Sequence, residues 1–161
     1  MLYNVPSRTG VNMSPEIIIR LADLDNIVSL KQATSDLDQF VEIRKSTSSD
    51  FHIYAGDDAV TLPFLSLGAT GVVSVASHFI GNQLQDMVTK YAAGDVTGAT
   101  EIHLKYSKLF NDLFIMTNPI PTKTALRLQG WSVGGPRLPL IDATPDVEAR
   151  LAQLLEELNL L

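Results

Sequence analysis

The sequence predicts an α/β domain built on a parallel sheet, and two observations support the prediction. Four short apolar stretches begin near residues 1, 27, 51 and 71, and each is followed by a helical pattern, which is the rhythm of βα units. Polar or small residues gather where these stretches end, among them Lys31, Gly56 and Ser74. The carboxyl ends of parallel strands meet at one edge, where α/β barrels place their active sites.

The composition fits one domain, with or without a small appendage, because the chain has 161 residues of which 45% are hydrophobic. The formal net charge is −6 and the basic residues are scattered, which argues against a nucleic-acid partner. Residues 1–6 lack a basic or long apolar region, and no run of about 18 apolar residues follows, so we expect no signal peptide and no membrane helix. The chain has no cysteine, and the cytoplasm is the default location.

The first strand is expected at residues 1–4, and a turn at 5–10, where proline and glycine occur together. Ser14 and Pro15 are typical of the N-cap and first position of a helix, which should end near residue 24. The next strand, 27–31, is an apolar, β-branched run of the kind found in buried parallel strands.

The same patterns predict the rest of the first part of the chain. Leu37, Phe40 and Val41 recur at helical spacing and are expected to form the inner stripe of one helix. Pro63 allows only a short or kinked helix around it. The expected elements are helices at 36–45 and 59–67, and strands at 51–55 and 72–75.

Beyond residue 78 the patterns are helical throughout. Gly94, Gly130 and the Asn118–Pro121 segment separate the helices, and a loop rich in glycine and proline covers 131–139. The expected helices are 82–93, 98–116, 122–129 and 147–158.

Lys31 is a candidate catalytic residue because lysine is strongly hydrated and is rarely buried without a partner. Desolvation at the carboxyl end of a buried strand lowers the pKa of an amine, which leaves a larger neutral fraction able to form a Schiff base with a carbonyl compound. The alternative is a solvated lysine that ends a strand at the surface.

The number of strands does not match a complete barrel. A parallel (β/α)8 barrel has eight strands in about 250 residues, and this sequence supplies four. An open four-stranded sheet would leave both edges unpaired. The alternatives are a half-barrel that needs a partner, a small doubly wound domain, or a fragment.

Several motifs, in this order, resemble those of the dihydrodipicolinate synthases. YNVPSRTG at 3–10 is similar to YNxPxRTG, and LKQATSDL at 30–37 is similar to the KEATGDL stretch with the Schiff-base lysine. GDD at 56–58, GVVSV at 71–75 and NPIPTK at 118–123 resemble GDD, GVISV and NPIPxK. Gln32 stands where glutamate is usual, and Ser35 where glycine is usual.

The resemblance implies a TIM (β/α)8 barrel of the class I aldolase type, of which this chain would hold strands five to eight and a C-terminal helical appendage. It implies a half-barrel at 1–94 and a helical domain at 95–161. The amino-terminal half of the family enzyme would lie outside this sequence, together with its Thr-Thr pair, a tyrosine contributed across a subunit interface and the feedback site for lysine.

The resemblance also implies the chemistry: condensation of pyruvate with L-aspartate 4-semialdehyde to 4-hydroxy-tetrahydrodipicolinate, on the route to lysine and diaminopimelate. This reaction is expected to need the missing amino-terminal half. Lys31 would form the Schiff base and Tyr3 would relay protons, while Arg8 would hold a substrate carboxylate. The backbone carbonyl of Val73 would line the pyruvate pocket, and Gly56 would leave room beside it. No cofactor or metal is expected, and the family implies a homo-oligomer, commonly a tetramer.

Three functional hypotheses remain open on the sequence. Arg8 favours the synthase, since the related sialic-acid lyases tend to lack arginine in that loop. The second hypothesis is another pyruvate-dependent class I aldolase, and the third is an inactive truncated or structural module. Exposed sheet edges lead us to expect that the isolated chain self-associates or misfolds. The three histidines show no metal-ligand spacing, and Asp57 and Asp58 are expected to cap a helix.

Overall fold

A computed structural model describes all residues, 1–161, and they form two compact units. The first unit comprises residues 1–74 and 82–103, and the second comprises 75–81 and 104–161. No helix is both long and apolar enough to cross a membrane. Each unit is described by itself below.

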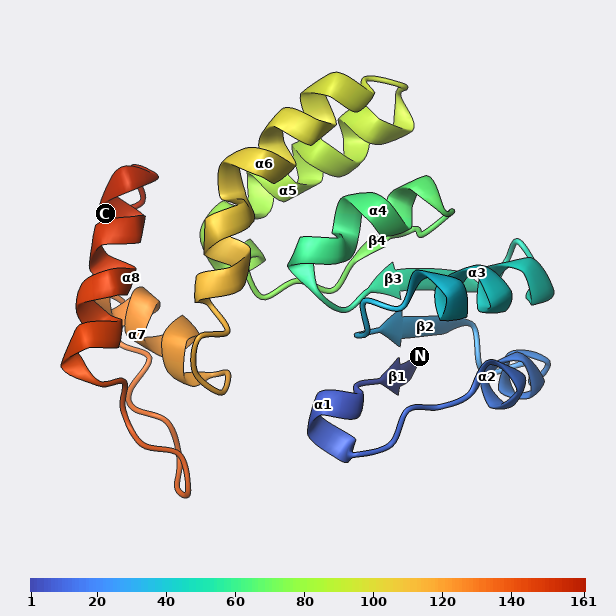
Figure 1. Ribbon diagram of the computed structural model, residues 1–161, viewed down its shortest axis with the longest axis horizontal. Coiled ribbons are helices and arrows are strands. Elements are labelled where there is room, and N and C mark those ends of the chain that lie inside the picture. The colour runs from blue at the N-terminus through green and yellow to red at the C-terminus, as the bar shows by residue number, and fades with distance from the viewer. The chain divides into compact units, whose positions relative to one another are not determined.

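The first unit contains one parallel sheet, with strands in the order β1-β2-β3-β4 (Figure 1). This arrangement confirms the predicted α/β class. The strands are β1 (Leu2–Asn4), β2 (Ser29–Gln32), β3 (His52–Ala55) and β4 (Gly71–Val72). The connections hold α1 (Pro6–Thr9), α2 (Pro15–Ala22), α3 (Leu37–Ser46), the 3-10 turn η1 (Asp58–Val60) and α4 (Thr61–Ser66).

One face of the sheet is buried by helices α2, α3 and α4. Successive residues of a strand point to opposite faces, so the fully buried Leu30 and Ile53 face the helices. Phe40 of α3 and Phe64 of α4 meet above them with ring centroids 4.3 Å apart. This apolar cluster packs the helices against the sheet. The strand residues between its members, such as Lys31 and Tyr54, point to the other face.

Four expectations for this unit are wrong in detail. Strand β2 covers Ser29–Gln32 and not 27–31. Residues 6–9 form a helical turn, α1, because Pro6 begins it and Gly10 ends it in the left-handed region, at φ 72°. The inner stripe of α3 consists of Gln39, Phe40 and Ile43, whereas Leu37 and Val41 are exposed. Strand β4 is shorter than expected and begins one residue earlier.

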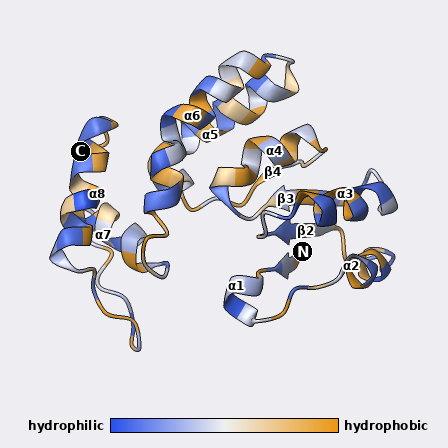
Figure 2. Cartoon of the chain, viewed as in Figure 1, coloured by the Kyte–Doolittle hydropathy of each residue, from blue (hydrophilic) through white to orange (hydrophobic).

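The helices of the later chain are α5 (Ser77–Ala92), α6 (Val96–Asp112), α7 (Ile120–Leu128) and α8 (Pro145–Glu157). Hydrophobic and hydrophilic residues alternate along α6 (Figure 2). The α5 helix begins earlier than predicted and is interrupted at Ile80, whose φ and ψ are not helical.

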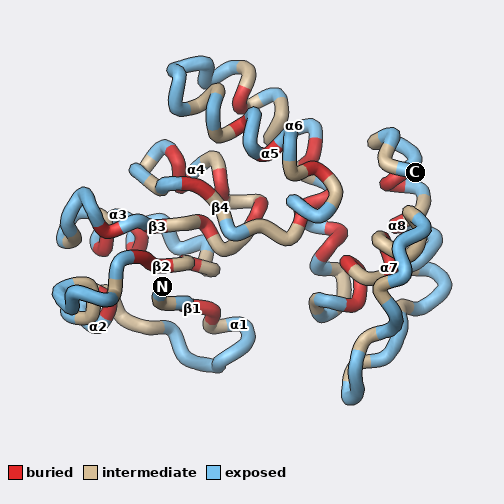
Figure 3. Tube along the Cα trace, turned by 180° about the vertical axis from the view of Figure 1, so that it is seen from behind, coloured by how far each residue is buried: buried red, intermediate tan, exposed pale blue.

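In the second unit the buried carboxylate of Asp112 accepts two hydrogen bonds from Arg150 of α8, at 3.0 and 2.6 Å. Leu151, Leu154 and Leu155 form the buried face of α8. The segment between α7 and α8 is largely exposed (Figure 3).

Candidate functional site

The candidate site forms a row across the sheet of the first unit. Strand register pairs Tyr3 with Lys31, Lys31 with Tyr54, and Tyr54 with Gly71. Because the strands are parallel and in register, the three side chains point to the same face, opposite the helices. The row sits near the carboxyl ends of the strands, where the sequence pattern placed the polar residues.

Lys31 and Tyr3 are in direct contact. The Nζ atom of Lys31 lies 4.4 Å from the centroid of the Tyr3 ring, within the range of a cation–π interaction. Lys31 is half-buried and Tyr3 is 49% exposed, so a small ligand can reach both side chains. An amine that can add to a carbonyl group therefore stands beside a phenol that can donate and recover a proton.

Gly56 follows β3 directly and lies against Ala33, the second residue after Lys31. Its N–H donates to the carbonyl of Gln32 at 2.7 Å, which continues the ladder between β2 and β3. A Cβ atom at position 56 would lie 2.7 Å from the Cβ of Ala33. The structure therefore gives a local reason for glycine here, which is the close approach of two chain segments.

Val73 follows β4, and its N–H donates to the carbonyl of Ala55 at 2.9 Å. This bond extends the ladder one residue beyond the assigned strand. Val73 is 38% exposed and lies two residues past Gly71, the last member of the row.

Arg8 lies on α1, which follows directly from β1 at the carboxyl end of that strand (Figure 1). The residue is exposed and belongs to the last turn of this short helix. The structure thus brings Lys31 and Tyr3 together, while Arg8 lies on α1, which follows the strand of Tyr3.

Two features of the site were not predicted from the sequence. Tyr54 is paired with Lys31 across the strands and belongs to the same row. The alternation of side chains along residues 51–55 could have indicated that it faces the same side of the sheet. Asn4 and Gln32, one residue past Tyr3 and Lys31, are almost fully buried and hydrogen-bonded to each other at 3.0 Å. The sequence does not reveal this pair, because only the strand register shows that Asn4 and Gln32 are neighbours.

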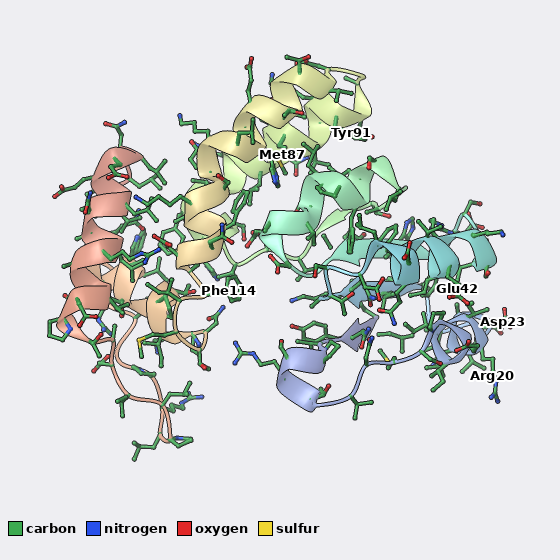
Figure 4. The ribbon with its side chains drawn as sticks, viewed as in Figure 1. Arg20, Asp23, Glu42, Met87, Tyr91 and Phe114 are labelled. Atoms are coloured by element: carbon green, nitrogen blue, oxygen red, sulfur yellow. The ribbon has the colours of Figure 1, made fainter.

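Several other charged residues of the first unit are not members of the row. Arg20, Asp23 and Glu42 are exposed around α2 and α3, away from the carboxyl ends of the strands (Figure 4). Asp57 accepts a hydrogen bond from the N–H of Ala59 at 3.0 Å and so caps the turn η1, as predicted. No group of three or more His, Asp or Glu side chains in the structure is placed to hold a metal ion.

Comparison with known proteins identifies relatives along the whole chain. The model of the dihydrodipicolinate synthetase family matches residues 1–158. The 4-hydroxy-tetrahydrodipicolinate synthase of a Nostoc species is 56% identical over 161 residues, which are all of this chain and 55% of the relative. The corresponding enzyme of Cyanothece is 54% identical over the same span.

Solved structures show the same relationship. The structure of dihydrodipicolinate synthase from Cyanidioschyzon merolae with lysine bound has a TM-score of 0.98 and 54% identity, and the match covers 100% of this chain and 55% of that one. The enzyme from Aquifex aeolicus has a TM-score of 0.95 and 40% identity, with 98% and 54% covered. The chain therefore spans about half the length of the relatives it matches.

Proposed function

Because the chain belongs to the dihydrodipicolinate synthetase family, we propose that Lys31 forms a Schiff base with pyruvate and so begins its condensation with L-aspartate 4-semialdehyde. The contact of the Lys31 amine with the Tyr3 ring at 4.4 Å is the observation that carries the proposal. It joins two residues from separate strands that the family motifs single out independently.

The neutral amine of Lys31 adds to the ketone carbon of pyruvate, and the resulting carbinolamine loses water to give an iminium ion. Loss of a proton from the adjacent methyl group gives the enamine. The enamine carbon attacks the aldehyde carbon of L-aspartate 4-semialdehyde, whose oxygen takes up a proton. The amino group of that substrate then displaces the Lys31 amine and closes the ring. Tyr3 is the proposed carrier of protons to and from these intermediates.

The proposed binding residues surround this pair. Arg8 is suited to a substrate carboxylate, because a guanidinium group donates two parallel hydrogen bonds to it. The carbonyl of Val73 and the space beside Gly56 are the proposed lining of the pyruvate pocket. The covalent Schiff base replaces a cofactor in this scheme.

The architecture of the whole enzyme is also a proposal. We place β1 to β4 as strands five to eight of a (β/α)8 barrel, with a domain boundary near residue 94. The four-stranded parallel sheet, which has half the strands of a complete barrel, and the helices α5 to α8 that follow it support this assignment. Strands β1 and β4 are the edges of the sheet in this chain, which supports association with further barrel strands. A homo-oligomer in the cytoplasm is the assembly and location that we propose for the enzyme.

A trapping experiment tests the proposal. The purified chain is incubated with pyruvate and reduced with borohydride, which converts the iminium ion into a stable secondary amine. Trypsin does not cleave after the modified Lys31, so the adduct is found on a peptide of residues 21–44, between the cleavage sites Arg20 and Arg44. We expect this peptide to carry the pyruvyl group.

Two variants make the result specific. Lys31→Ala is expected to abolish the adduct, whereas Lys45→Ala replaces another exposed lysine of the same unit and is expected to leave it intact. An adduct distributed over several lysines, or a folded chain that forms none even after the amino-terminal half of a family enzyme is added, would contradict the assignment of Lys31.

A further inference from the structure

A closed circuit of hydrogen bonds lies behind the reactive pair, on the opposite face of the sheet. Met13 donates its N–H to Oδ1 of Asn4 at 3.0 Å, and Nδ2 of Asn4 donates to Oε1 of Gln32 at 3.0 Å. Nε2 of Gln32 donates to Oε1 of Gln39 at 2.6 Å, and Nε2 of Gln39 returns to the carbonyl of Met13 at 2.9 Å. Asn4, Gln32 and Gln39 are all buried.

The main chain of Met13 fixes the direction of the circuit. A backbone N–H can only donate and a backbone carbonyl can only accept, so Asn4 must present oxygen to one and Gln39 must present nitrogen to the other. Gln32 is then obliged to accept from Asn4 and to donate to Gln39. Its second amide hydrogen is directed at the hydroxyl of Thr34, at 3.1 Å.

Three of the four members of the circuit adjoin the proposed site. Asn4 follows Tyr3, and Gln32 follows Lys31, in the same pair of strands. The segment 5–12, which contains Arg8, is held together at its ends, because Asn4 precedes it and is hydrogen-bonded to Met13, which follows it. Oδ1 of Asn12 accepts from Nδ2 of Asn4 at 2.7 Å, which strengthens this closure.

We propose that the circuit of Asn4, Gln32, Gln39 and Met13 is the positioning device that holds the Lys31 amine against Tyr3 and fixes the loop with Arg8. Gln32 is its key residue, because only a group that both donates and accepts completes the circuit. A carboxylate at position 32 would present oxygen to the oxygen of Gln39. The inference rests on the proposed function and deepens it, since these residues act through Lys31, Tyr3 and Arg8.

The test compares Gln32→Glu with Gln32→Met in the full chain. At neutral pH both variants are expected to slow pyruvate trapping on Lys31 by about tenfold, because a displacement of a fraction of an ångström at a reacting group is costly. As the pH falls, the new carboxyl group takes up a proton and can donate again. Relative to the unsubstituted chain at each pH, Gln32→Glu should therefore recover its rate, whereas Gln32→Met should not.

A second measurement does not depend on activity. The Nζ atom of Lys31 lies over the face of the Tyr3 ring, so the protons on the adjoining ε-carbon should show an upfield NMR shift. Gln32→Glu should reduce this shift at neutral pH and regain it in acid. Gln129→Glu makes the same change at a glutamine of the second unit, which donates to the carbonyl of Leu160 at 2.7 Å, and should leave the shift and the trapping rate unchanged.

The outcomes separate the two proposals. If the unsubstituted chain forms no adduct even with the added amino-terminal half, but the NMR shift responds to Gln32→Glu, the proposed function fails and the positioning role stands. If the adduct forms and Gln32→Glu alters neither the rate nor the shift, the positioning role is refuted. Should Gln32→Glu fail to fold, Gln39→Leu removes the two circuit bonds that Gln39 makes with Gln32 and Met13, and unchanged trapping and NMR shift in that variant would refute the positioning role equally.

Discussion

Gly56 provides a quantitative test of how tightly the site is built. In Gly56→Ala the new Cβ would lie 2.7 Å from the Cβ and 2.9 Å from the Cα of Ala33, where ordinary contacts begin at 3.4 Å. Ala33 must therefore move by at least 0.7 Å, the difference between 3.4 and 2.7 Å. The contact includes the backbone of Ala33, so a change of rotamer cannot relieve it.

The displacement has two expected consequences. Overpacking of this kind lowers the free energy of unfolding by about 1–3 kcal/mol. Ala33 is two residues from Lys31, and the bond from the Gly56 N–H to the carbonyl of Gln32 couples the two strand ends. A movement of this size at a reacting amine should slow pyruvate trapping by about tenfold.

Urea unfolding followed by circular dichroism measures the first effect, and the rate of borohydride-trapped adduct measures the second. Gly135→Ala is the control outside the site, because its Cβ would lie 3.6 Å from the nearest atom of Asp142, an ordinary contact. If both variants lose the same stability and the same trapping rate, close approach to Ala33 is not the reason for glycine at position 56.

Three further predictions concern the rest of the chain. Phe40→Ala should lower the free energy of unfolding by about 3–5 kcal/mol, because Phe40 is fully buried against Phe64; Leu37→Ala, on the same helix but 45% exposed, should cost far less, and equal losses in urea titrations would contradict the observed inner stripe of α3. Asp36→Ala should cost about 1 kcal/mol, because its carboxylate accepts from the N–H of Gln39 at 2.9 Å; Thr144→Ala, at a helix N-cap without such a bond, should cost less in the same assay. Burial lowers the pKa of His103 below its usual value of 6.5, so the folded state holds this proton less tightly than the unfolded state does. Neutral His103 therefore contributes stability above pH 6.5 that is lost as the pH falls through the lowered pKa, so His103→Gln should flatten the decline of stability on acidification below 6.5, and an unchanged slope would count against the burial effect.

Much of the candidate site could be predicted because its residues occur in motifs. Lys31 follows an apolar run, and Tyr3 and Arg8 share one eight-residue motif, so local sequence was enough to propose their roles. Tyr54 and the amide circuit were not predicted, because their significance depends on which residues are neighbours across strands. The expected inner stripe of α3 was wrong for the same reason: Gln39 turns inward to join the circuit, and Leu37 and Val41 turn outward.

The sequence by itself determined the α/β class, the order of strands and helices, and the family to which the chain belongs. These properties depend on local periodicity, on capping residues such as Asp36 and on short motifs, all of which lie within a few residues along the chain. Only the tertiary structure decided that Lys31 lies over Tyr3, that Gly56 meets Ala33, and that Gln32 must both donate and accept. Strand register brings together residues that are about 20 to 30 positions apart, and the contacts that register creates are not encoded in any single segment.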